Sequence, residues 1–93
     1  MATQKTTHNI DDTAMARLGR EYVRTGDDVG AASALRTAAW LEPTLVPAHL
    51  ALADTYLRLG QPALAVQAIE AGLRSLPESA ELKQKLLDIK GSR

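Results

Sequence analysis

The chain has 93 residues, the size of one domain, and its 11 basic and 11 acidic side chains give a formal net charge of zero. This balance lacks the basic excess of nucleic-acid-binding domains, and the absence of cysteine excludes disulfides, thiol catalysis and cysteine-ligated metals. Ala and Leu dominate an apolar fraction of 45%, while Tyr22, Trp40 and Tyr56 are the only aromatic residues. Because Ala and Leu favour helices, this composition predicts an all-α protein.

The N-terminal residues 1–11 are polar and rich in Thr, which predicts a disordered tail. They lack the apolar stretch of a secretory signal, and no apolar run in the chain approaches the roughly 18 residues of a membrane span. We therefore expect a cytoplasmic protein without membrane contacts; a secreted chain whose signal has been removed is the alternative. The bias towards Ala, Arg and Leu is typical of a GC-rich bacterial genome.

Two helices are predicted in the first half of the chain. Spacings of three and four residues between apolar side chains indicate one helix, which acidic residues 11 and 12 or Thr13 can cap and which Gly26 ends in a left-handed conformation. Asp27 caps a second helix, at about residues 28–41, and Pro43 stops it. The apolar face of the first helix consists of Met15, Leu18, Tyr22 and Val23.

The same order of signals recurs in the second half. Pro47 lies in the first turn of a third helix that Gly60 ends, and Pro62 opens a fourth helix that Pro77 stops. A fifth helix is predicted at residues 79–90. Its apolar residues occupy one face only and Leu87 falls between the faces, which is typical of a helix that caps a repeat stack. The inner face consists of Leu82, Leu86 and Ile89.

An internal repeat of 34 residues underlies this recurrence. When residues 12–45 are aligned with 46–79, 8 of the 34 positions are identical, and they lie at turns and at sites suited to helix packing. Repetition at this period is the sequence signature of a helical solenoid. The identical pairs are Ala14 and Ala48, Leu18 and Leu52, Tyr22 and Tyr56, Arg24 and Arg58, Gly26 and Gly60, Ala31 and Ala65, Ala34 and Ala68, and Pro43 and Pro77.

These positions resemble the tetratricopeptide repeat, whose pattern has Leu with Gly or Ala, then Tyr, Gly, Ala, a large apolar residue, a small residue and Pro. Here the pattern reads Leu18, Gly19, Tyr22, Gly26, Ala31, Leu35, Ala38 and Pro43, and then Leu52, Ala53, Tyr56, Gly60, Ala65, Ile69, Gly72 and Pro77. The resemblance implies a right-handed superhelical stack of antiparallel helix pairs with five helices. Repeat one would occupy residues 12–45, repeat two 46–79 and the capping helix 79–90, followed by a tail at 91–93.

Four residues bear on where the stack begins and how tightly its core packs. Glu21 and Thr25 are polar where a preceding repeat would pack, so we expect the stack to begin with this repeat; a chain cut from a longer array is the alternative. His49 replaces a bulky aromatic residue and Asp28 an apolar one, which suggests a core looser than that of an ideal repeat. Because about three repeats are usually needed for stability, we expect a marginally stable chain or one stabilised by self-association or a partner.

The resemblance also implies a non-catalytic adaptor or chaperone that holds a partner polypeptide in a concave groove, lined by the first helix of each repeat. Arginine suits carboxylates, so we expect a peptide or protein of acidic character. The alternative is a solvated face whose arginines pair with Glu21, Asp54 and Asp88. The predicted groove residues are Arg17, Arg20, Arg24, Leu50, Asp54, Leu57, Arg58 and Lys85, with Thr13, Ala16, Val23, Ala51, Glu81, Gln84 and Asp88 around them.

Trp40 occupies a repeat position that is usually charged and faces solvent. An exposed Trp is a frequent interface anchor. A second hypothesis is therefore that the chain forms a homodimer or scaffold through Trp40 and the ends of the stack. Alternatively, Trp40 folds back over Leu41, Leu45 or the third helix as ordinary packing.

Catalytic chemistry is not indicated. His8 lies in the predicted tail and His49 in a helix, so the two imidazoles do not suggest a site. Asp27 and Asp28 directly follow Gly26, where helix capping explains them better than metal binding. No phosphate-binding loop is present, since GDDVG lacks the required spacing and lysine. We therefore predict no enzyme activity, no cofactor, no metal site and no nucleic-acid partner.

Overall fold

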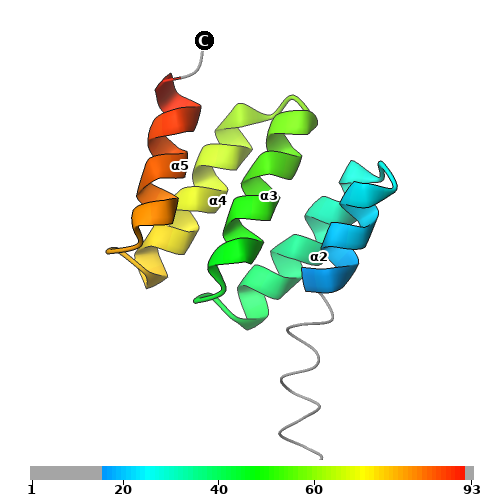
Figure 1. Ribbon diagram of the computed structural model, residues 1–93, viewed down its shortest axis with the longest axis horizontal. Helices are drawn as coiled ribbons and strands as arrows, with labels where there is room; N and C mark the ends of the chain where they lie inside the picture. Colours follow the sequence, from blue (N-terminus) through cyan, green and yellow to red (C-terminus); the bar gives the residue numbers. More distant parts are fainter. Residues whose placement is uncertain (1–15, 92–93) are drawn as a thin grey trace, which may run out of the picture.

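The computed structural model describes residues 16–91, and every element in this range is helical. Helical residues 16–24 are followed by α2 (Asp28–Leu41), α3 (Val46–Arg58), α4 (Pro62–Ser75) and α5 (Ala80–Gly91). Consecutive helices run antiparallel and lie side by side (Figure 1). The prediction of an all-α stack of antiparallel helix pairs is confirmed. The predicted tail at 1–11, together with Thr13 and Met15, lies outside the described residues.

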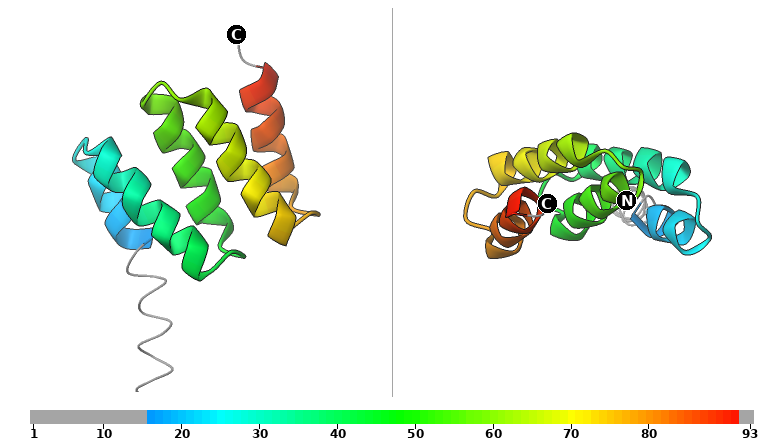
Figure 2. Two further views of the ribbon diagram at one scale, coloured as in Figure 1. Left: turned by 180° about the vertical axis from the view of Figure 1, so that it is seen from behind. Right: turned by 90° about the horizontal axis from the view of Figure 1, so that it is seen from above.

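The helices form two layers. Viewed from above, α2 and α4 lie in one layer, and residues 16–24, α3 and α5 lie in the other (Figure 2). The molecule measures 51 × 32 × 14 Å, and its smallest dimension fits two layers of helices spaced about 8–10 Å apart. It therefore has two broad surfaces. We call the surface formed by residues 16–24, α3 and α5 the groove face, and the opposite surface the α2/α4 face.

The helix ends follow from local residue chemistry. Gly26 and Gly60 have φ angles of +86° and +74°, the left-handed conformation that only glycine adopts readily, so each turns the chain between the two helices of a pair. The Asp27 carboxylate accepts a hydrogen bond from the Gly30 amide at 2.9 Å, and this caps α2. These observations confirm the predicted turn glycines and the capping role of Asp27.

The core is built from small residues packed against a few large ones. Leu35, Ile69 and Leu82 are almost fully buried, and a Cβ added to Gly19 would lie 2.5 Å from Leu35 Cγ. Helices can approach this closely only where one side of the contact has little or no side chain. The small residues that are completely buried are Ala31, Ala38, Ala53 and Ala65.

His49 and Asp28, the two departures from the repeat pattern, both make specific contacts. His49 is buried, its Nε2 lies 2.7 Å from the Pro43 carbonyl oxygen, and a Cβ added to Gly72 would lie 2.8 Å from its Cγ. A large ring therefore faces a glycine. Asp28 accepts a hydrogen bond from Arg58 Nε at 3.0 Å, which joins α2 to α3.

Leu18, on the predicted apolar face of the first helix, is 42% exposed, whereas its repeat equivalent Leu52 is 5% exposed. Leu52 lies on α3, which packs against α2, α4 and α5. Residues 16–24 lie at one edge of the described stack (Figure 1), so the same position has fewer neighbours there.

Candidate binding surfaces

The groove face carries a hollow between residues 16–24 and α3. Its volume is about 290 Å³. Three arginines and one carboxylate line it, and Arg20 makes no ion pair with another residue of 16–91. The lining residues, all of them predicted groove positions, are Arg20, Val23, Arg24, Ala51, Asp54 and Arg58.

A second hollow on the groove face lies between α3 and α5. Its volume is about 470 Å³, and two acidic residues and one lysine line it. The charge of the groove face therefore changes along the stack, from an excess of arginine at the first hollow to an excess of carboxylate at the second. The lining residues are Leu50, Ala80, Glu81, Gln84, Lys85 and Asp88.

Three predicted positions lie elsewhere. Arg17 and Leu57 are exposed but line neither hollow. Ala16 is a correction, because it is 6% exposed and packs with Ala38 and Ala48 in a small core cluster. The resemblance to the tetratricopeptide repeat placed Ala16 with the groove residues, and it could not show that α2 and α3 cover this side chain.

Ion pairs partly neutralise the groove face. Arg24 pairs with Glu21, three residues before it, and Lys85 Nζ lies 2.7 Å from Asp54 Oδ1. Of the three carboxylates in the solvated-face alternative, only Glu21 pairs with an arginine. Asp54 pairs with Lys85, and Asp88 accepts a hydrogen bond from Gln84 at 2.8 Å. The Lys85–Asp54 pair also joins α5 to α3 across the second hollow.

The contact between Glu21 and Arg24 shifts the pKa of both side chains. The hydrogen bond from Arg24, followed by its positive charge, lowers the pKa of Glu21, and the same contact raises the pKa of Arg24. A carboxylate whose pKa is lowered on folding stabilises the fold above its ordinary pKa, and this contribution is lost as the pH falls through the lowered value. Because both side chains are more than half exposed, solvent screens the pair and the effect on stability is small.

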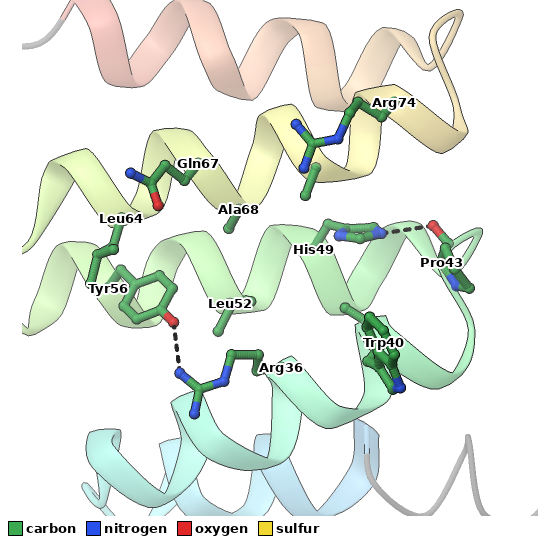
Figure 3. Close-up of a pocket in the computed structure, with 12 residues that line it drawn as sticks. Arg36, Trp40, Pro43, His49, Leu52, Tyr56, Leu64, Gln67, Ala68 and Arg74 are labelled. Carbon is green, nitrogen blue, oxygen red and sulfur yellow. Dashed lines mark hydrogen bonds between the residues drawn. The ribbon is translucent and has the colours of Figure 1, made fainter.

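A further cavity lies on the α2/α4 face, where the sequence predicted no groove. It is a cleft of about 620 Å³ between α2 and α4, with α3 below it (Figure 3). Trp40 stands at its edge and is 82% exposed, so it does not fold back over Leu41, Leu45 or α3. The cleft is lined by Arg36, Ala39, Trp40, Pro43, His49, Leu52, Tyr56, Leu64, Gln67, Ala68, Ala71 and Arg74.

One sequence signal could have indicated this cleft. Trp40 and Arg74 occupy the same position of the 34-residue repeat, so they lie on corresponding faces of α2 and α4. Small residues accompany them, since Ala39, Ala68 and Ala71 line the cleft without filling it.

Antiparallel helix pairs stacked in two layers, with hollows along one face, define a helical-repeat protein of the binding type. Residues 46–89 match the family model of the tetratricopeptide repeat, and these residues comprise α3, α4 and most of α5. The prediction that the chain carries this repeat is confirmed. The assignment of residues 12–45 as a first repeat stays a prediction, supported by the eight identities in the 34-residue alignment.

The tetratricopeptide repeat is in general a non-catalytic unit that mediates protein–protein interaction. A search of the curated proteins found no match. None of the helices among residues 16–91 is long and apolar enough to cross a membrane. Within the same range, no three His, Asp or Glu side chains lie close enough together to hold a metal ion.

Proposed function

We propose that the chain is a cytoplasmic adaptor or chaperone that holds a partner polypeptide along its groove face. The observation that carries the proposal is the first hollow, where Arg20, Arg24 and Arg58 surround a single carboxylate, Asp54. Guanidinium groups bind carboxylates in a forked geometry, so an acidic segment of the partner fits here. The second hollow favours a basic or polar segment, because Glu81 and Asp88 outnumber Lys85 there.

The change in charge along the face gives the bound polypeptide a direction. Its acidic segment lies between residues 16–24 and α3, and its neutral or basic segment continues between α3 and α5. A partner with the opposite order would place like charges together, which disfavours that orientation. The groove face thus supports recognition of charge order as well as overall charge.

The test is charge reversal at the first hollow. Arg20→Glu/Arg24→Glu is preferable to a variant that includes Arg58, because Arg58 links α3 to Asp28 of α2 and its loss would also weaken the fold. The wild-type chain and this variant, both tagged, are used to capture proteins from native lysate, and mass spectrometry identifies what each retains. We expect the wild type to retain a defined partner and the variant to lose it.

The matched control is Lys83→Glu/Lys90→Glu, which has the same change in net charge on exposed residues of α5 that line neither hollow. It should retain the partner, and both variants should keep the helical circular dichroism of the wild type. A partner retained equally by the wild type and Arg20→Glu/Arg24→Glu would refute binding at the first hollow.

The exposure of Trp40 favours a second candidate function, self-association through Trp40 and the ends of the stack. An exposed tryptophan often anchors an interface because its large ring buries much surface at little entropic cost. Sedimentation at increasing protein concentration tests this candidate. A mass that rises with concentration in the wild type, and stays at that of the monomer in Trp40→Ala, would support it. A wild type that stays monomeric would exclude it.

A further inference from the structure

The cleft on the α2/α4 face is a separate surface from the groove face, and the inference drawn from it does not depend on the function proposed above. The cleft exists because α2 and α4 both pack on α3, while small side chains leave the space between them unfilled. Leu52 and Tyr56 of α3 form its floor, Ala68 lines the α4 side, and Trp40 and Leu64 stand on opposite walls (Figure 3). The floor is therefore apolar and the walls rise above it.

The charge of the cleft has one sign. Arg36 lies on α2 near Tyr56, and Arg74 lies on α4 near the other end, close to His49 and Pro43 (Figure 3). No carboxylate lines the cleft, and neither arginine forms an ion pair with another residue of 16–91. Arg36 makes only a long hydrogen bond to the Tyr56 hydroxyl, at 3.5 Å. Both guanidinium groups are thus available to an incoming carboxylate.

The size and shape of the cleft indicate the class of ligand. A volume of about 620 Å³ is large enough for several side chains, and the α4 wall from Leu64 to Arg74 is about 15 Å long at the rise of an α-helix. A peptide helix of similar length presents apolar side chains at every third or fourth residue to such a groove. Acidic residues at the edges of that apolar stripe would meet Arg36 and Arg74.

We propose that the α2/α4 cleft binds an acidic amphipathic helix of a partner protein. The apolar stripe of the helix packs on Leu52, Tyr56 and Leu64, the Trp40 ring closes over it, and flanking carboxylates pair with Arg36 and Arg74. The chain would then hold partners on both of its broad surfaces.

A second copy of this chain fits the cleft less well. The large apolar residues that are more than half exposed within residues 16–91 are Val29, Trp40 and Leu87. Val29 and Trp40 lie on α2 with Arg36 between them, and Leu87 lies alone on α5. No helix of the described part therefore offers a continuous apolar stripe flanked by carboxylates.

The test uses a displayed library of amphipathic helical peptides, each about four helical turns long. One face varies among Leu, Ile, Met and Phe, and the positions beside it vary among Glu, Lys and Ser. Peptides selected by the wild-type chain are then titrated while the emission of Trp40 is recorded. Trp40 is the only tryptophan of the chain, and the library contains none, so the signal reports on the cleft alone.

We expect Glu to be enriched over Lys beside the apolar face, and the emission of Trp40 to shift to shorter wavelength on binding. Loss of a central aromatic anchor or a paired charge typically weakens binding about tenfold or more. Arg36→Glu/Arg74→Glu and Trp40→Ala should both show this loss, the latter read by anisotropy of a labelled peptide. Lys83→Glu/Lys90→Glu should bind as the wild type does.

Three outcomes would overturn the proposal. The first is selection of Lys, of uncharged flanks or of no peptide at all. The second is equal affinity of the selected peptide for the wild type and for both cleft variants. The third is a shift of Trp40 emission that follows protein concentration without peptide and coincides with dimers in sedimentation, because a second copy would then occupy the cleft.

Discussion

Single small residues decide how closely neighbouring helices approach in this protein. Gly19 faces Leu35, and an added Cβ would lie 2.5 Å and 2.6 Å from the Leu35 Cγ and Cδ2 atoms. The equivalent positions of the second repeat are Ala53 and Ile69, both fully buried. At these two positions residues 12–45 thus have Gly and Leu, and residues 46–79 have Ala and Ile.

Gly19→Ala should destabilise the chain. The new methyl group overlaps a buried leucine, which typically costs about 1–3 kcal/mol, and the better helix propensity of Ala offsets about 1 kcal/mol of that. We expect a net loss of about 1 kcal/mol in the free energy of unfolding, measured by urea denaturation. Adding Leu35→Ile recreates the contact of the second repeat and should recover most of the loss. A double variant less stable than Gly19→Ala would show that the two contacts are not equivalent.

At the scale of the helix, α5 buries only one of its faces against the rest of the stack. Leu82 is completely buried and Ile89 nearly so, whereas Leu87 is 65% exposed. The buried face packs on α4 and α3, and the Lys85–Asp54 pair adds a polar link to α3. The helix thus covers apolar surface of the second repeat and presents charged residues to solvent.

Leu82→Ala tests this capping role. Removal of a fully buried leucine side chain typically costs about 2–5 kcal/mol, which is a large part of the stability of a small domain. Leu87→Ala on the same helix removes an equal number of atoms from an exposed site and should change the free energy of unfolding by less than about 0.5 kcal/mol. Both values follow from urea denaturation. Similar losses in the two variants would mean that α5 does not cap the stack.

At the scale of the whole molecule, α3 is the central element. It packs on α2, α4 and α5, and its buried residues include Leu52, Ala53, Thr55 and Tyr56. In a repeat stack each unit contacts only its neighbours, so local stability should fall from the centre towards the edges. The thin two-layer shape leaves most helices with one side in solvent.

Amide hydrogen exchange should therefore divide the helices by position. We expect the slowest exchange in α3 and faster exchange in residues 16–24, which lie at one edge of the described stack (Figure 1). Fragment-resolved mass spectrometry measures both. Equal protection across all helices would indicate that the chain opens only by global unfolding.

The predicted count of two repeats is below the roughly three that solenoids usually need, so we expect the overall stability to be low. We expect a free energy of unfolding at or below the lower end of the range of about 5–15 kcal/mol. Partner peptide that binds only the folded state should raise the melting temperature as its concentration rises. A melting temperature above about 90 °C for the isolated chain would contradict this expectation.

The amino-acid sequence by itself determined the elements of this protein and their order. Gly26 and Gly60 adopt positive φ, and Asp27 caps α2, because turns and caps depend on a few adjacent residues. The 34-residue period predicted a helical solenoid, and the resemblance to the tetratricopeptide repeat implied antiparallel pairs and most of the residues that line the two hollows of the groove face.

Only the tertiary structure decided which side chains meet between helices. Ala16 is buried, in contrast to its predicted groove position, and Leu18 of the predicted apolar face is 42% exposed, because burial depends on which neighbouring helix covers a residue. The Asp28–Arg58 pair joins residues 30 positions apart. The α2/α4 cleft depends on how far apart two helices lie when both pack on a third. Spacing along the chain reports the face of one helix, whereas these features depend on distances between helices that are set by the packing of the whole core.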